Sequence, residues 1–136
     1  MARKTDSSER PVTSDPIVEP AVDEATLLTL LGHDRQLALE LFEVFTQDMH
    51  HQRPALHSAA LAGDVRALVR LAHRLKGSTM NLGCPGAANI AADLEQHAAA
   101  LDPATLESLV RSLDAEIDRC LQQMVNLRAL WHGSST

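Results

Sequence analysis

From Asp23 onward, apolar residues recur every three or four positions, which is the spacing of residues that share one face of an α-helix. This pattern predicts a short helix after Asp23 and four long helices after it. Aspartates that can cap a helix precede four of the five segments, at Asp23, Asp34, Asp64 and Asp102. Connections of about two to six residues favour an antiparallel up-down four-helix bundle, with the short N-terminal helix packed across one end.

Each long helix carries one apolar stripe that we expect to face a common core. The stripes are Leu37, Leu41, Val44, Phe45, Met49, Gln52, Leu56 and Ala59 on the first long helix; Val65, Leu68, Ala72, Leu75, Thr79 and Leu82 on the second; Ala87, Ile90, Leu94, Ala98 and Leu101 on the third; and Leu106, Leu109, Leu113, Ile117, Cys120, Met124, Leu127 and Trp131 on the fourth. Pro54 lies inside the first long helix, where a proline costs about 3 kcal/mol. It predicts either a kink near Arg53 or two stacked helices.

The two ends of the chain lack the helical pattern. Residues 1–22 hold three of the six prolines among polar residues, which predicts a disordered N-terminal tail. Residues 23–131 form the predicted helical domain. Residues 132–136 contain Gly133 and three hydroxyl residues, and they predict a flexible C-terminus.

Composition supports an all-α fold and excludes several classes of protein. The 136 residues include 21 Leu and 20 Ala but only 11 Val and Ile, a bias toward strong helix formers. The net charge of −6 disfavours a nucleic-acid partner. Because no apolar run could span a membrane or serve as a signal core, we expect a cytoplasmic protein without membrane contact.

The second long helix, which begins after Asp64, carries the candidate chemistry. On a helical wheel, His73 lies one residue off the core stripe and faces solvent, with Lys76 about 60° to one side and Gly77 about 40° to the other. Arginines and a methionine lie on the same face: Arg66, Arg70 and Met80. The sequence has no acidic residue between Val65 and Ala92, and Lys76 is the only lysine after Lys4. A lysine provides a compact, mobile charge that suits a phosphate oxygen.

Gly77 is costly in a helix interior, by about 1 kcal/mol relative to alanine. It therefore suggests that another molecule approaches the backbone beside His73. The alternative is that Gly77 simply ends the helix, although Thr79 and Leu82 continue the core stripe beyond it.

The segment His73-Arg-Leu-Lys76-Gly77-Ser78-Thr79, followed by Leu82-Gly83 and by Leu94-Glu95, resembles the signature of the histidine-containing phosphotransfer (HPt) domain family. That signature is His, any residue, Leu, Lys, Gly, Ser and another small residue, and then Leu-Gly. The similarity extends over about residues 22–130.

The resemblance implies a stand-alone carrier in a multistep two-component phosphorelay. His73 would accept a phosphoryl group through its outward ring nitrogen, Lys76 would help to neutralise that group, and Gly77 would leave room for a docking receiver domain. Gly83 would shape the turn into the next helix. The face around His73 would meet the partner through Arg66, Arg70, Arg74 and Met80.

The family often places a glutamine from the next helix near the histidine, where this chain has Glu95 with Gln96 beside it. Which of the two supports the imidazole is left open by the sequence. The partners would be the receiver domains of a hybrid sensor histidine kinase and of a response regulator. The carrier would need no cofactor of its own and no ATP site, any Mg²⁺ would belong to the receiver domain, and a monomer is expected.

Two other functions compete with this one. A phosphoacceptor and dimerisation fragment of a histidine kinase would have an acidic residue directly after the histidine, where Arg74 stands, and a following ATP-binding domain. An inactive helical adaptor would carry His73 incidentally, and the absence of acid-labile phosphate on His73 would identify it.

Other reactive residue types have simpler interpretations. His50, His51 and His57 lie on one predicted helix, but adjacent histidines point about 100° apart, and no Glu-x-x-His pair accompanies them, so we expect no metal site. Cys84 could be mildly activated by a helix N-terminus, but without a second cysteine at a redox spacing we interpret it as structural.

Overall fold

The computed structural model describes residues 20–134, and in this range the chain forms helices and turns without a β-strand. The elements are α1 (Glu24–Leu30), α2 (Arg35–Ala62), α3 (Val65–Asn81), α4 (Pro85–His97), the short 3-10 helix η1 (Ala98–Ala100) and α5 (Pro103–Ser134). The predicted all-α class is confirmed.

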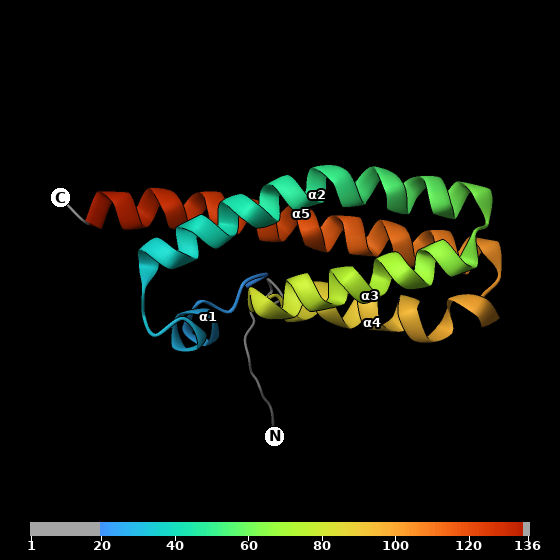
Figure 1. The fold of residues 1–136 in the computed structure, drawn as a ribbon, viewed down its shortest axis with the longest axis horizontal. Coiled ribbons are helices and arrows are strands. Elements are labelled where there is room, and N and C mark those ends of the chain that lie inside the picture. Colours follow the sequence, from blue (N-terminus) through green and yellow to red (C-terminus); the bar gives the residue numbers. More distant parts are fainter. Residues whose placement is uncertain (1–19, 135–136) are drawn as a thin grey trace, which may run out of the picture.

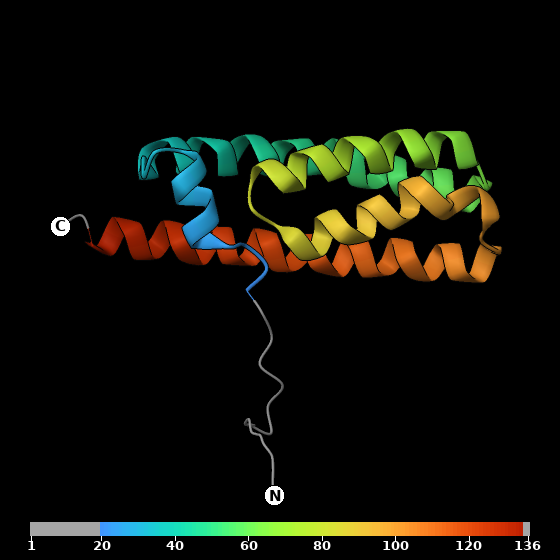
Figure 2. The same cartoon turned by 90° about the horizontal axis from the view of Figure 1, so that it is seen from below.

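Helices α2, α3, α4 and α5 lie side by side, and consecutive helices run in opposite directions (Figures 1 and 2). Each contacts its neighbour along the chain, and α2 also contacts α5. At 1.5 Å per residue, the 28 residues of α2 and the 32 of α5 extend well beyond the 17 residues of α3. Helix α1 runs across the stretch of α2 and α5 that α3 and α4 leave uncovered (Figure 2).

All four predicted aspartates precede helices. The carboxylates of Asp23, Asp34, Asp64 and Asp102 each accept a hydrogen bond from the backbone N–H three residues later. Gly63 ends α2 in the left-handed conformation, with φ +66°. These local signals set where α1, α2 and α3 start, and they therefore set which residues share a helix face.

The core positions on the four long helices follow a 4-3 alternation. The buried residues are Ala38, Phe42, Phe45, Met49, Gln52, Leu56 and Ala59 on α2; Leu68, Ala72, Leu75 and Thr79 on α3, with Leu82 just after it; Ala87, Ala88, Ala91 and Leu94 on α4, with Ala98 after it; and Leu106, Val110, Leu113, Ile117, Cys120, Met124, Leu127 and Trp131 on α5. This heptad spacing keeps one face of each helix against its neighbours.

The predicted stripe of α2 is wrong at its start. Val44 is 62% exposed and Leu37 is 37% exposed, whereas Ala38 and Phe42 are buried. The ring of Phe42 stacks on that of Trp131 from α5, with the centroids 5.9 Å apart. This contact keeps α2 in heptad register, so a small alanine occupies the core position and the neighbouring leucine lies at the surface.

Smaller shifts of the same kind occur on α4 and α5. Ile90, Leu101 and Leu109 are half-buried. The heptad core positions next to Ile90 and Leu109 are filled by Ala91 and Val110. Helix α5 also extends to Ser134, beyond the expected end at residue 131. Residues 135–136 of the expected flexible end lie outside the described residues.

The packed domain begins before the expected boundary at residue 23. Ala21 and Val22 are buried, although the sequence pattern places both in the N-terminal tail. The Gln123 side chain on α5 holds this segment: its Oε1 accepts from the Val22 N–H and its Nε2 donates to the Val22 carbonyl, both at 2.8 Å. Residues 1–19, which make up the rest of the expected tail, lie outside the described residues.

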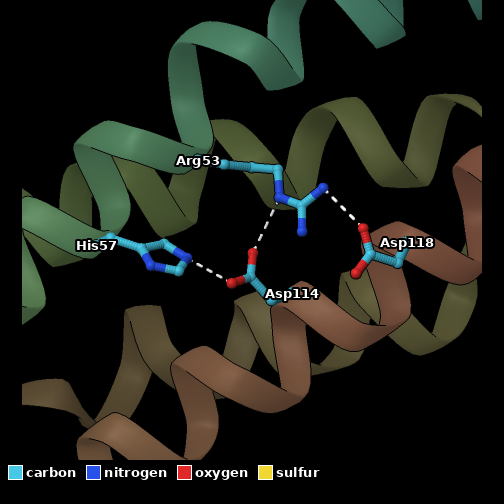
Figure 3. Close-up of polar contacts among 4 residues, drawn as sticks. All are labelled: Arg53, His57, Asp114 and Asp118. Atoms are coloured by element: carbon cyan, nitrogen blue, oxygen red, sulfur yellow. Dashed lines mark hydrogen bonds and ion pairs between the residues drawn. The ribbon is translucent and has the colours of Figure 1, made fainter.

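Pro54 does not divide α2 into two stacked helices, since α2 is continuous from Arg35 to Ala62. The α2 helix is bent along its length (Figure 1). Residues on both sides of Pro54 are tied to α5 (Figure 3): Arg53 Nε lies 3.0 Å from Asp114 Oδ1, and His57 contacts the other oxygen of Asp114. Arg53 also pairs with Asp118 at 2.8 Å. These contacts bind the proline-containing turn to α5 although one backbone hydrogen bond is lost there.

The turn between α3 and α4 depends on Gly83. Its φ is +68°, and its carbonyl accepts a hydrogen bond from the Asp23 N–H at 2.7 Å. A Cβ at this position would lie 3.2 Å from the Asp23 carbonyl oxygen. The glycine therefore allows both the left-handed backbone and the close approach of the segment that leads into α1.

We predict that Gly83→Ala destabilises the protein more than Gly63→Ala. Both glycines have nearly the same positive φ, but a Cβ at Gly63 would meet no atom within 4 Å. The shared backbone strain should cost about 1–2 kcal/mol. Crowding against Asp23 should add about 1 kcal/mol at position 83. Denaturant unfolding of both variants measures the difference, and equal losses would show that the Asp23 contact yields without strain.

Candidate phosphoacceptor site on α3 and α4

His73 projects from the middle of α3 into solvent. Its side chain is 66% exposed, whereas its neighbour Ala72 and the next core residue, Leu75, are completely buried. The wheel position predicted from the sequence is therefore correct. A helix that is anchored by buried residues on one face holds the imidazole in a fixed direction on the other.

Helix α4 brings Glu95 against this imidazole. His73 Nδ1 lies 2.7 Å from Glu95 Oε2, and Lys76 Nζ lies 2.7 Å from Glu95 Oε1. Gln96 is exposed. The structure thus answers the question that the sequence left open, because Glu95 is the residue that contacts the ring.

The Glu95 carboxylate is held in its ionised form. The adjacent Lys76 ammonium, and secondly the His73 imidazole, lower the pKa of Glu95 below its ordinary value. An ionised carboxylate can only accept hydrogen bonds, so His73 Nδ1 must be the donor. In a neutral imidazole this arrangement leaves the lone pair on Nε2, the nitrogen away from Glu95.

Gly77 lies within α3, which continues to Asn81, so the alternative in which Gly77 ends the helix is wrong. A Cβ at this position would meet no other atom within 4 Å. Packing inside the domain therefore does not require a glycine. The open space lies one turn from His73, on the surface that a partner would have to approach.

The remaining predicted contact residues surround His73 on the exposed face of α3. Arg66, Arg70, Arg74 and Met80 are all exposed. None of the three arginines forms an ion pair with another residue in the described range. This face therefore presents unneutralised positive charge on a protein whose net charge is −6.

A shallow hollow beside the site was not predicted. Its volume is about 150 Å³, and it lies between α2 and α3, lined by Leu41, Val44, Phe45, Asp48, Ser78, Asn81 and Leu82. Leu41 is half-buried and packs against the core, whereas Val44 is exposed. The 4-3 alternation through Ala38, Phe42 and Phe45 is the sequence signal that places Val44 at the surface.

The other candidate residues do not gather into a metal site. His57 contacts Asp114, and no three His, Cys, Asp or Glu side chains in residues 20–134 are placed to hold a metal ion. Cys84 is buried, and a hydrogen bond with the Cys120 thiol together with burial raises the pKa of Cys84 above its ordinary value. The helix N-terminus therefore does not activate this thiol.

An exposed histidine that is paired with a carboxylate, flanked by a lysine and carried on antiparallel helices fits a histidine phosphotransfer domain. The Hpt domain family model matches residues 40–127, and the chain belongs to this family. Proteins of this family carry phosphoryl groups and interact with receiver domains, and the chain accordingly has a histidine phosphotransfer role in a phosphorelay.

Among solved structures, the chain is similar to histidine-containing phosphotransfer protein B (HptB) from Pseudomonas aeruginosa PAO1. The two are 25% identical with a TM-score of 0.74, over 82% of this chain and 97% of that one. No curated protein matches the chain. In the described part of the chain, no helix is both long and apolar enough to cross a membrane.

We predict that Gly77→Gln reduces phosphoryl transfer from a receiver domain without destabilising the fold. Glutamine favours a helix over glycine, so stability should stay equal or rise by up to about 1 kcal/mol. The longer side chain would occupy the space beside His73. A thermal melt and a transfer assay measure the two effects.

Gly77→Ala is the matched control, because alanine also favours a helix over glycine but adds only a single methyl group. It should keep most of the transfer rate. If Gly77→Gln also transfers normally, the open space at position 77 has no role in docking.

Proposed function

We propose that the chain accepts a phosphoryl group on Nε2 of His73 from the aspartyl phosphate of one receiver domain and passes it to the aspartate of another. The observation that carries this proposal is the contact between His73 Nδ1 and Glu95, which leaves Nε2 directed outward on an exposed ring. The scaffold that we propose for this exchange is an antiparallel four-helix bundle formed by α2 to α5.

The proposed step needs no group beyond those of the two proteins and the metal of the receiver. The Nε2 lone pair attacks phosphorus, the P–O bond to the aspartate breaks, and the aspartate leaves as a carboxylate with the bonding electron pair. The proton on Nδ1 stays in place throughout. Transfer to the second receiver is the reverse step, in which the electron pair returns to Nε2.

Lys76 provides positive charge within reach of the transferred group. It is one turn from His73 and is held by Glu95, with its side chain 29% exposed. Charge in this transition state spreads over three oxygens, so positioning and nearby cations account for most of the catalysis. We expect Lys76 to shift from Glu95 toward the phosphoryl oxygens when these arrive.

The surroundings of His73 favour an acidic partner. Arg66, Arg70 and Arg74 surround the histidine with free positive charge, and Met80, which is 59% exposed, adds apolar area on the same face of α3. A receiver domain presents carboxylates at its phosphorylation site. Complementary charge of this kind increases the rate of encounter and sets the orientation of docking.

The finer properties of the carrier are also proposals. We propose that it has no kinase activity, that Mg²⁺ is supplied by the receiver domain, and that it acts as a cytoplasmic monomer between a hybrid sensor kinase and a response regulator. Arg74, which follows His73 directly, argues against the phosphoacceptor fragment of a histidine kinase, because that fragment would have an acidic residue there.

We predict that the protein stays unlabelled with ATP and Mg²⁺ alone and becomes labelled when a phosphorylated receiver domain is added. His73→Gln should abolish the label. An acid-lability test distinguishes phosphohistidine from phosphoserine. Labelling by ATP alone would indicate a kinase, and no label from any receiver domain would favour the inactive adaptor.

We predict that Lys76→Ala slows transfer to His73, since one charge-assisted contact with the phosphoryl group is lost, at about 1–3 kcal/mol. Helicity should not change. Arg111→Ala removes an equal charge from the exposed surface of α5, outside the face around His73, and is the control. Rapid-quench transfer assays compare the two variants, and equal rates in Lys76→Ala and the wild type would mean that the arginines or the partner supply the charge.

A further inference from the structure

The structure contains a second histidine whose polar surroundings match those of His73. His57 on α2 contacts one carboxylate oxygen of Asp114 on α5 through Nε2. Arg53, one turn earlier on α2, binds the other oxygen at 3.0 Å (Figure 3). At the first site, a carboxylate on α4 bridges His73 and a lysine in the same way. The same combination of a carboxylate and a cation one turn away therefore occurs at both histidines.

We propose that His57 is a second phosphoryl-accepting residue, which takes a phosphoryl group on Nδ1 from a small phosphoryl donor. The two histidines serve different sides of the bundle, because the His57 contact joins α2 to α5 and the His73 contact joins α3 to α4. The inference goes beyond the proposed function, since it concerns another residue and donors other than receiver domains.

The contact with Asp114 determines which ring nitrogen of His57 can react. A carboxylate ion accepts hydrogen bonds and does not donate them, so Nε2 carries the proton that lies between the two side chains. In the neutral imidazole the lone pair is therefore on Nδ1. Within residues 20–134, no hydrogen bond or ion pair engages this Nδ1. The His57 side chain is 51% exposed, so the ring is open to a small molecule in solution.

Asp114 also stabilises the ring during phosphorylation. When Nδ1 bonds to phosphorus, positive charge develops on the imidazole, and the Nε2–H donates to a carboxylate that is already in place. The Asp114 side chain is only 17% exposed, and Arg53 holds its second oxygen. Arg53 is in turn fixed by Asp118 at 2.8 Å. The carboxylate is therefore held more firmly than the ring that it supports.

A cleft beside His57 provides space for the donor. It lies between α2 and α5, its volume is about 360 Å³, and its polar groups come from His57, Glu107 and Arg111. This volume is at the small end of the range for ligand sites. The opposite charges of Glu107 and Arg111 offset each other, so the cleft does not repel a small anion. Because the cleft has room for a small molecule and not for a folded domain, we assign small donors to it.

The chemical step can be written with phosphoramidate, which reacts as a zwitterion with a protonated amino group. The Nδ1 lone pair attacks phosphorus, the P–N bond breaks, and nitrogen leaves as neutral ammonia with the bonding electron pair. The proton on Nε2 stays between His57 and Asp114 throughout. An acyl phosphate reacts in the same way, with a carboxylate as the leaving group.

The first test follows labelling by phosphoramidate in His73→Gln, which removes the acceptor of the proposed function. We expect label on His57 at Nδ1, located by phosphorus-31 NMR correlated with the ring protons. His50 is the internal control, since it lies two turns earlier on α2, is exposed, and has no carboxylate partner among the described residues. His57 should be labelled about 10-fold faster than His50. Equal labelling of the two histidines, or label on Nε2 of His57, overturns the inference.

Two carboxylate variants, made in the His73→Gln background, separate the proposed role of Asp114 from a purely structural one. Asp114→Asn should slow labelling of His57 about 10-fold, because the developing charge loses its carboxylate. Asp118→Asn is the matched control, since it removes a carboxylate that contacts Arg53 and not the ring, and it should be labelled at the parent rate. Circular dichroism checks that each variant is folded. Equal rates in the two variants overturn the inference.

A phosphorylated receiver domain serves as the donor in a parallel measurement. It should leave His57 unlabelled in His73→Gln, and label on His57 from this donor would overturn the assignment of small donors. If phosphoramidate labels His57 but no receiver domain labels His73 in the wild type, the proposed function fails while the inference about His57 stands.

Discussion

The turn between α3 and α4 fixes which side chains of these two helices face each other, and the site depends on it. In an antiparallel helix pair, residues at similar distances from the turn are neighbours. His73 comes ten residues before Gly83 and Glu95 comes twelve residues after it. The left-handed Gly83 and its hydrogen bond with Asp23 set this register. A shift of one residue would replace Glu95 with a neighbour that points elsewhere.

The rest of the domain serves to hold this pair of helices rigid. The 4-3 core alternation runs through α2, α3, α4 and α5, so the face opposite His73 is buried along its whole length. On the far side, Arg53 and His57 tie the turn around Pro54 to α5. Phosphoryl transfer needs an accurately placed nucleophile more than a deep pocket, and an exposed ring on a well-anchored helix meets that need.

The sequence predicts the all-α class, four aspartate caps and the exposure of His73, because each depends on local spacing or on a single residue type. It failed where packing between distant helices decides. Leucines outrank alanines in hydrophobicity, yet Ala38 and Ala91 occupy core positions because the heptad register requires them there. Val22 gave no signal, since its burial depends on Gln123, 101 residues away. Glu95 could be chosen over Gln96 only once the helix register was known.

We propose Nε2 of His73 as the atom that carries the phosphoryl group. The most direct measurement is an NMR spectrum that correlates phosphorus-31 with the histidine ring protons after transfer from a receiver domain. We expect one phosphorus signal, coupled to the ring of His73 through Nε2. A phosphorus signal on Nδ1 of His73, or on the ring of any other histidine, would contradict it.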